Sequence, residues 1–159
     1  MNMLYQIHTK QFLPISVKEA WDFLSSPANL QAITPDYMGF QIRSGFREGE
    51  KMYAGMIIEY TVRPVLGIPL HWVTEITHVQ EPEYFVDEQR FGPYALWHHK
   101  HFIRPVEGGV EMEDVVHYKL PLGWLGKLAH MLFVKRQLRQ IFDFREKKLT
   151  ELFGQSLRV

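Results

Sequence analysis

Two histidines separated by one residue, with carboxylates on nearby stretches, are the side chains of this sequence best suited to acid–base chemistry. His99 and His101 lie in an alternating stretch from Ala95 to Ile103. On a strand both imidazoles point to one face, roughly 6.5 Å apart. Imidazoles exchange protons near neutral pH, and a neighbouring carboxylate can hold and orient them. The pattern predicts candidate proton carriers at His99, His101, Asp87 and Asp114.

The carboxylates come from two other alternating stretches, Phe85 to Phe91 and Val110 to Leu120. On the faces that we assign inward, these stretches carry Asp87, Gln89 and Asp114. An unpaired buried polar group costs a few kcal/mol, and side chains on neighbouring strands lie about 5 Å apart. The five polar residues can therefore satisfy one another as a structural cluster. Alternatively, some of them present hydrogen bonds to a ligand in an apolar pocket.

Other chemistries find little support in the sequence. His99, His101 and Asp114 resemble a two-histidine, one-carboxylate metal set, but two ligands at strand spacing are weak evidence, and we expect no metal and no cofactor. The chain has no cysteine, which excludes disulfides, thiol catalysis and cysteine metal sites. It also lacks a nucleophile motif and a glycine-rich phosphate loop.

The elements that must position these residues are mostly strands. Ser16 and Glu19 form a capping box before a first short helix, and Ser26-Pro27 begins a second that ends at Thr34-Pro35. Apolar and polar residues alternate, or nearly so, in six stretches that we predict to be strands: Leu4 to Leu13, Met52 to Val62, Leu70 to Val79, Phe85 to Phe91, Ala95 to Ile103, and Val110 to Leu120.

A long helix is predicted from Trp124 to Phe153, because no proline occurs there and Gly154 follows as a C-cap glycine. Its apolar stripe comprises Val134, Leu138, Ile141, Phe142, Leu149 and Leu152. Before Val134, apolar residues occur on nearly all sides of the predicted helix. The order of elements predicts an α+β fold in which a curved antiparallel sheet of about six or seven strands wraps around the long C-terminal helix, with two short helices after the first strand.

The chain opens with Ile15-Ser16-Val17-Lys18-Glu19-Ala20-Trp21-Asp22-Phe23, and Ile33-Thr34-Pro35 follows. These residues resemble the start of the START-like (Bet v 1-like, SRPBCC) helix-grip superfamily. Phe85-Val86-Asp87-Glu88-Gln89, Gly92-Pro93-Tyr94 and Trp97-His98-His99-Lys100-His101-Phe102 resemble its bacterial branch, which is similar to polyketide cyclase/dehydrase and coenzyme Q-binding proteins. The resemblance implies one START-like ligand-binding domain over residues 1–159, with a deep cavity for hydrophobic small molecules.

The expected function is the binding, transport or presentation of a lipid, isoprenoid or aromatic polyketide. The alternatives are a cyclase, dehydratase or isomerase and, more weakly, a protein-interaction module, because some members of that branch are labelled cell-division inhibitors. Whether the protein is an enzyme stays open. We expect the ligand to contact Met56, Ile58, Tyr60, Trp72, Asp87, Gln89, Trp97, His99, His101, Asp114, Tyr118, Leu125, Leu128, Leu132, Leu138 and Phe142.

The apolar start of the last helix is predicted to be a mobile gate from Leu125 to Phe133, beside the cavity entrance. Extended backwards at 100° per residue, the buried stripe takes in Trp124, Met131 and part of Leu128, and leaves Leu125, Ala129, Leu132 and Phe133 pointing elsewhere. Lys127 and His130 flank this surface and could meet lipid head groups or a partner. Alternatively, the loops around Pro64 to Pro69 and Gly92-Pro93 cover it.

The overall charge and the apolar composition limit the classes of partner that we expect. Eighteen basic and eighteen acidic residues give a net charge of zero, which argues against nucleic acid. No apolar run approaches the roughly 20 residues of a membrane span, and no signal peptide is evident, so we expect a cytoplasmic protein. A hydrophobic small molecule is the expected partner, transient contact with a membrane surface is allowed, and either a monomer or a homodimer is compatible with the sequence.

Overall fold

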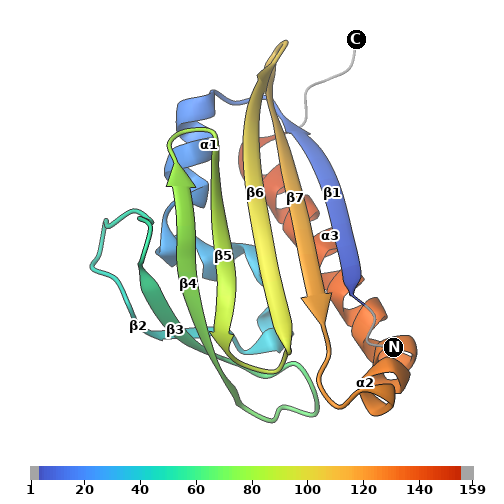
Figure 1. Ribbon diagram of the computed structural model, residues 1–159. Helices are drawn as coiled ribbons and strands as arrows, with labels where there is room; N and C mark the ends of the chain where they lie inside the picture. The colour runs from blue at the N-terminus through green and yellow to red at the C-terminus, as the bar shows by residue number, and fades with distance from the viewer. Residues whose placement is uncertain (1–3, 155–159) are drawn as a thin grey trace.

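A computed structural model describes residues 4–154, in which seven antiparallel strands form one sheet. In the order β1-β7-β6-β5-β4-β3-β2, strands β2 to β7 form a meander, and β1 pairs with β7 at one edge (Figure 1). The strands are β1 (Tyr5–Leu13), β2 (Gln41–Ser44), β3 (Ile57–Val62), β4 (Leu70–Gln80), β5 (Tyr84–Phe91), β6 (Leu96–Val106) and β7 (Gly109–Lys119).

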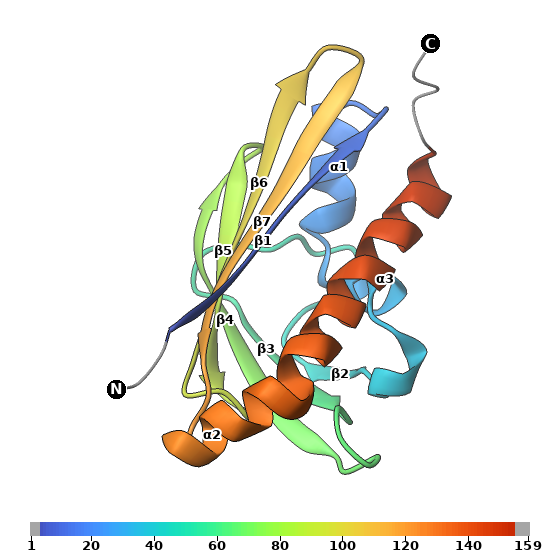
Figure 2. The same ribbon diagram turned by 90° about the vertical axis from the view of Figure 1, so that its right-hand side faces the viewer.

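One long helical segment crosses the concave side of the sheet, and the shorter helices lie on the same side (Figure 2). The helices are α1 (Val17–Leu24), the 3₁₀ helices η1 (Pro27–Ile33) and η2 (Asp36–Met38), α2 (Trp124–Ala129), the π-helical turn η3 (His130–Val134) and α3 (Lys135–Phe153). This arrangement is the predicted α+β helix-grip fold.

Local sequence explains how the short helices begin. The Ser16 hydroxyl accepts the Glu19 N–H at 3.2 Å, and the Glu19 carboxylate accepts the Ser16 N–H at 2.9 Å, so the predicted capping box is confirmed. The second short helix also begins where predicted, with Pro27 in its first turn, but it is a 3₁₀ helix and the Ser26 side chain makes no capping hydrogen bond.

The strand prediction is wrong at two places near the open edge of the sheet. β3 begins at Ile57, because the Met56 N–H bonds the Tyr53 carbonyl in a turn in which Gly55 has a φ of 94°. β2 was not predicted, because its four residues carry only Ile42 as an apolar side chain and give no alternation to detect.

The tightest apolar packing lies at the end of the molecule where α1 and the last turns of α3 meet the sheet. Trp21 from α1, Leu13 from β1, Val110 from β7 and Leu149 from α3 are almost fully buried in one cluster there. This cluster fixes the C-terminal half of α3 on the sheet and leaves the N-terminal half free to enclose a space.

The π-helical turn changes which residues of the last helix face inward. The buried residues Gly126, His130, Val134, Leu138 and Phe142 recur every four residues, and an α-helix with 3.6 residues per turn cannot keep that spacing on one face. The turn η3 takes up one extra residue and brings the two halves into phase.

Because of this shift, the phase predicted for the start of the helix is wrong by one residue. Trp124 and Met131 were expected to continue the buried stripe, but they are 74% and 64% exposed. His130, which was expected to flank the surface, is buried instead. The alternative in which loops cover this segment is also wrong, since Leu128 and Leu132 are exposed as well.

Gly126 shows how closely this segment is tied to the loop before it. A Cβ atom built on Gly126 would lie 2.1 Å from the Pro121 carbonyl oxygen. The glycine therefore permits a close backbone approach and does not merely weaken the helix, as its propensity alone would indicate.

We expect Gly126→Ala to destabilise the protein by about 1–3 kcal/mol, although alanine favours helix formation by about 1 kcal/mol. The free energy of unfolding from urea titration measures this change. Leu128→Ala, at an exposed position of the same helix, is the control and should have a smaller effect. A Gly126→Ala protein more stable than the natural one would contradict the close approach.

Candidate functional site

A cavity of about 560 Å³ lies between the sheet and the N-terminal half of the long helix. Strands β3 to β6 form one wall, η1 and η2 with the residues around them form a second, and α2 to α3 form the third. The walls are mostly apolar, with a polar cluster at the inner end. A volume of this size is typical of small-molecule sites, which span about 300–1,000 Å³.

Most of the residues predicted as ligand contacts lie on the cavity wall: Ile58, Tyr60, Trp72, Asp87, Trp97, His99, His101, Leu125, Leu138 and Phe142. Their strand and helix faces point into the same space, as the alternation predicts. Whether a ligand contacts them stays a prediction.

Six predicted contacts lie elsewhere. Met56 packs in the core beneath the turn before β3, and Tyr118 is buried against His130. Asp114 lies behind the two imidazoles on the next strand. Leu128 and Leu132 point outward because of the π-helical turn.

Gln89 is the sixth, and the prediction that it joins the polar cluster is wrong. Gln89 pairs with Thr74 in the same unshifted run in which Asp87 pairs with Ile76, so the strand places both side chains on one face. The Gln89 amide instead spans the β5–β6 turn, where it accepts the Tyr94 N–H at 3.1 Å and donates to the Tyr94 carbonyl at 2.6 Å. Gly92 makes room for it, since a Cβ there would lie 2.5 Å from the Gln89 side-chain oxygen.

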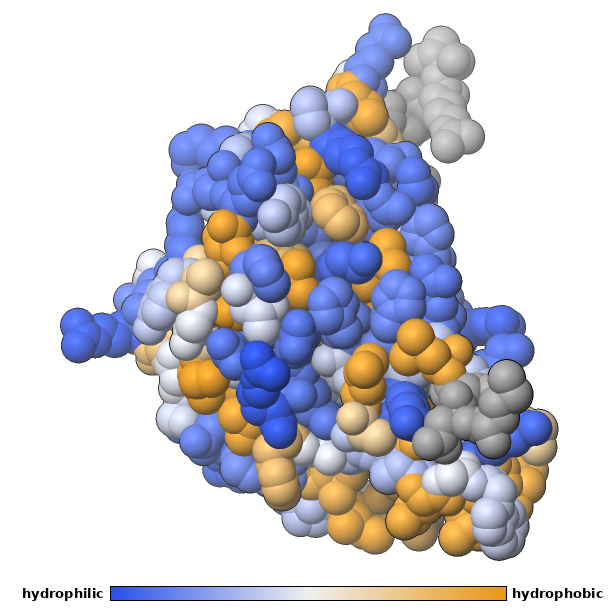
Figure 3. Space-filling view, viewed as in Figure 1, coloured by the Kyte–Doolittle hydropathy of each residue, from blue (hydrophilic) through white to orange (hydrophobic). Residues whose placement is uncertain are grey.

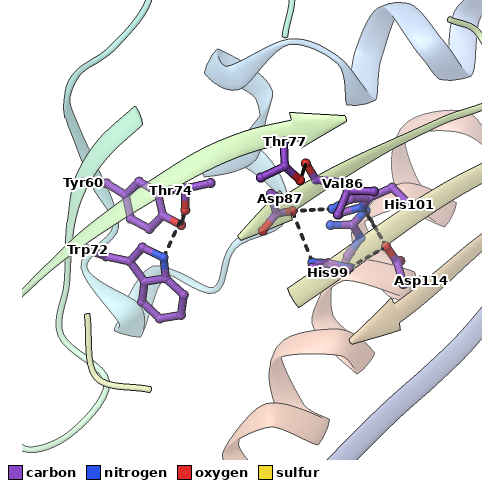
Figure 4. A network of polar contacts seen from close by, with 10 residues as sticks. Tyr60, Trp72, Thr74, Thr77, Val86, Asp87, His99, His101 and Asp114 are labelled. Carbon is purple, nitrogen blue, oxygen red and sulfur yellow. Dashed lines mark hydrogen bonds and ion pairs between the residues drawn. The ribbon is translucent and has the colours of Figure 1, made fainter. Parts of the chain in front are cut away.

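The other four polar residues form one buried cluster on three adjacent strands (Figure 4). His101 lies between two carboxylates, with Nε2 2.7 Å from Asp87 and Nδ1 2.8 Å from Asp114. His99 Nε2 is 2.9 Å from Asp114, and its Nδ1 is 3.6 Å from Asp87, beyond hydrogen-bonding distance. The two imidazole centroids are only 3.7 Å apart.

A fifth member, Arg145 of α3, was missed in the sequence. Its Nη2 atom lies 3.3 Å from Asp114, and the residue is 8% exposed. Arg145 also lines the cavity. The signal was present, because position 145 falls on the apolar stripe between Phe142 and Leu149, where an arginine needs an inward-facing partner.

In this cluster, Arg145 and the imidazoles offset the cost of burying two ionised carboxylates. Burial alone would raise the pKa of Asp114, but Arg145 and the imidazoles outweigh it and hold that pKa well below its usual range. Burial likewise opposes ionisation of Asp87, and His99 and His101 lower its pKa nonetheless. Burial disfavours a charged His101, yet its bonds to Asp114 and Asp87 raise its pKa. Two carboxylates thus face Arg145 and a His101 that holds its proton more readily than a free imidazole does.

His99 is the neutral member of the cluster. Burial is the largest cause that lowers its pKa, and the charged His101 beside it adds to the effect, although both carboxylates act in the opposite direction. With Nε2 donating to Asp114, the Nδ1 atom of neutral His99 carries a lone pair. The cavity wall therefore holds two imidazoles whose pKa values are shifted in opposite directions, an arrangement that can accept and donate protons.

A second polar group lies on the β3 and β4 wall (Figure 4). The Thr74 hydroxyl is 2.7 Å from the Tyr60 hydroxyl and accepts the Trp72 indole N–H at 3.1 Å. Burial raises the pKa of Tyr60, so its phenol stays protonated and neutral. These side chains satisfy one another and give this wall mixed aromatic and hydroxyl character.

One metal arrangement is geometrically accessible: Asp87, His99 and His101 each offer a ligand atom, all within 4.8 Å of one another. Asp114 contacts the other nitrogen of each imidazole, as orienting carboxylates do in metal sites. However, the 2.7 Å contact between His101 and Asp87 is a hydrogen-bond distance, so a proton already joins two of the three candidate atoms. The expectation of no metal stays a prediction that elemental analysis of the purified protein tests.

His130 anchors the π-helical turn to the sheet. Its ring stacks on Tyr5 at 3.6 Å between centroids, and its Nε2 atom is 2.8 Å from the Tyr118 hydroxyl. Burial lowers the pKa of His130 and raises that of Tyr118 to about 12, so both side chains are neutral near pH 7. The opening motion expected of the Leu125 to Phe133 segment stays a prediction.

The fold is shared with solved structures of low sequence identity. A protein from Chromobacterium violaceum superposes with a TM-score of 0.71 at 10% identity, covering 95% of this chain and 98% of that one. A Thalictrum norcoclaurine synthase point mutant, in complex with a transition-state analogue, gives 0.62 at 16% identity, with 96% and 98% covered. Ara h 8.0201 gives 0.59 at 14% identity, with 94% and 99% covered.

No family model and no curated protein sequence matches the chain. Within residues 4–154, no helix has the length and apolar character needed to cross a membrane. At such low identities the likeness concerns the fold. The chain has the helix-grip fold seen in Bet v 1-like structures, with a cavity between sheet and C-terminal helix.

Proposed function

We propose that the protein binds a hydrophobic small molecule in the cavity, within one START-like domain over residues 1–159, and that it transports or presents this molecule. The observation that carries the proposal is the 560 Å³ cavity with mostly apolar walls. An apolar cavity of this size stabilises an apolar ligand by removing its surface from water. The resemblance to the polyketide cyclase and coenzyme Q-binding branch favours a lipid, isoprenoid or aromatic polyketide.

The ligand that fits this chemistry has one polar group. His99, His101, Asp87 and Arg145 meet the cavity at its inner end, and the other walls are apolar or aromatic. A hydroxyl group would lie against the neutral His99 and donate to its Nδ1 atom, and this hydrogen bond compensates its loss of water. Trp72 and Trp97 line the cavity as well, so ligand binding should change tryptophan fluorescence.

Filling the cavity tests the proposal. Ala129 lies on the wall with a small side chain in a helix, and Ala129→Phe would project a ring into the space. We expect this variant to bind the apolar probe 8-anilino-1-naphthalenesulfonate at least about tenfold more weakly, since several kcal/mol of apolar contact is lost. Fluorescence titration measures the affinity.

The control is Leu128→Phe, one residue earlier, where the side chain is 42% exposed and off the cavity wall. It should bind the probe as the natural protein does. Equal binding by Ala129→Phe and the natural protein would show that the cavity is not the binding site. Mass spectrometry of apolar material co-purifying with the protein would identify the natural ligand.

An enzyme of the cyclase, dehydratase or isomerase type is the second candidate, favoured by two adjacent imidazoles, His99 with a lowered pKa and His101 with a raised one. Norcoclaurine synthase is an enzyme with this fold. The fate of the co-purified compound separates the two functions. A carrier returns it unchanged after incubation, whereas an enzyme converts it to a product that His99→Asn fails to form.

A further inference from the structure

The end of the molecule where the cavity opens carries an unusual concentration of exposed apolar side chains. The β3–β4 loop contributes Val65, Leu66 and Ile68, and the helical segment contributes Trp124, Met131 and Leu132. Leu66 is 91% exposed and Leu132 is 69% exposed. We call these six residues the docking surface. Single exposed apolar residues are ordinary, but a cluster of this kind marks a surface that meets an apolar partner.

The two parts of the docking surface belong to one end of the fold. In a meander the β3–β4 loop and the β7–α2 connection lie at the same end of the sheet, and Figures 1 and 2 show both there. The Gln137 amide donates to the Pro64 carbonyl and ties the loop to the helix. In Figure 3 orange side chains gather along this lower edge.

The docking surface is continuous with the cavity. Val65, Leu122, Leu125 and Phe133 line the cavity and are also exposed to solvent, so they form its rim. An apolar molecule could pass from a surface pressed against this end into the cavity without crossing a polar barrier. The partner must therefore be one that can hold apolar molecules itself.

The two chain segments that form the docking surface carry charges of one sign only. Residues 60–74 and 120–142 contain no aspartate or glutamate, and their exposed cations are Arg63, Lys127, Lys135, Arg136 and Arg139. Since the whole chain has a net charge of zero, this local excess is compensated elsewhere. The β4–β5 turn and the β6–β7 turn, at the opposite end, carry Glu81, Glu83 and Glu107.

We propose that this end of the protein docks on a lipid bilayer that contains anionic head groups. The apolar side chains enter the head-group boundary, and the flanking cations meet the lipid phosphates, as in interfacial helices. Trp124 suits the boundary because its indole is both apolar and polar. A second copy of the chain fits less well, since a symmetric contact would bring the cations of both copies together.

Vesicle flotation tests the docking, and it does not depend on what the cavity binds. The natural protein should bind vesicles of phosphatidylcholine with 30% phosphatidylglycerol at low salt, and phosphatidylcholine vesicles far more weakly. Lys127→Gln/Lys135→Gln should lower the partition coefficient about 25-fold, at about 1 kcal/mol per cation. Trp124→Ser/Leu132→Ser should lower it about 100-fold, because apolar contact with the bilayer is lost.

Matched controls lie at the far end of α3, where Leu152→Ser and Lys147→Gln/Lys148→Gln should float as the natural protein does. Circular dichroism checks that every variant is folded, and all of the altered residues except the half-buried Lys148 are exposed. The proposal is overturned if the natural protein ignores anionic vesicles, if the serine variant binds as well as the natural protein, or if sedimentation shows the surface closed in a dimer. Each of these outcomes is independent of whether the cavity binds the fluorescent probe, so the docking and the proposed function are tested separately.

Discussion

Replacing Arg145 with methionine should lower the free energy of unfolding by about 3–5 kcal/mol, because it leaves Asp114 buried without its guanidinium partner. Methionine keeps much of the length and the apolar stem of the arginine, so the packing against Phe142 and Leu149 changes little. Urea titration of the purified variant measures the effect. A loss of this size would show that the Arg145 guanidinium stabilises the buried polar cluster through its contact with Asp114.

Arg139→Met is the matched control, since Arg139 is exposed on the same helix. Its free energy of unfolding should stay within about 0.5 kcal/mol of the natural value. The double variant Arg145→Met/Asp114→Asn should be less destabilised than the sum of the two single changes, because removing both charges leaves no uncompensated ion. If Arg145→Met behaves like Arg139→Met, the ion pair does not stabilise the cluster.

The pH dependence gives an independent check on Arg145. In the natural protein the pKa of Asp114 is lowered, so its contribution to stability is present above about pH 3.9 and is lost as the pH falls through the folded pKa. Without Arg145, burial still raises the pKa of Asp114 and the imidazoles still lower it, so the carboxyl group should take up a proton at a higher pH than in the natural protein. The deficit of Arg145→Met should therefore shrink as the pH falls into the acid range, before the natural protein loses the contribution of Asp114.

The fold could be predicted from the sequence because its signals are local and repeated. Alternation places His99 and His101 on one face, and a one-residue slip would have turned both outward. The capping box at Ser16 marked the start of α1 in the same way. The position of the long helix across the sheet followed from its apolar stripe.

The errors arise where a local irregularity changes the period. The π-helical turn adds one residue to the helix, and no side chain in His130 to Val134 identifies it in the sequence. The face of the helix predicted for Trp124 and Met131 was therefore wrong. Gln89 has the register that alternation predicts, but its amide bonds the Tyr94 backbone in the neighbouring turn and does not join the polar cluster. Arg145 was overlooked for a different reason: a search for apolar residues along a stripe ignores the charged residue that interrupts it.

The two buried histidines should give stability profiles of opposite slope, which is the second large effect that we expect. The pKa of His99 is lowered on folding, so below about pH 6.5 the unfolded chain binds the extra proton and the free energy of unfolding falls. The pKa of His101 is raised, so its contribution is present below about pH 6.5 and is lost as the pH rises through the folded pKa.

Asparagine at each position removes one of these contributions and keeps a polar side chain beside the carboxylates. The deficit of His99→Asn relative to the natural protein should be largest above pH 7 and shrink towards pH 5. The deficit of His101→Asn should be largest near pH 5 and shrink as the pH rises. Each unit by which a pKa is shifted corresponds to about 1.4 kcal/mol. Urea titrations at half-unit steps from pH 5 to pH 9 measure both deficits.

Ile103→Val, a buried change on the same strand that removes no titratable group, should give a deficit that does not depend on pH. Parallel profiles for the two asparagine variants would mean that the imidazoles share one protonation state, and His99 would then not be the neutral member facing a ligand.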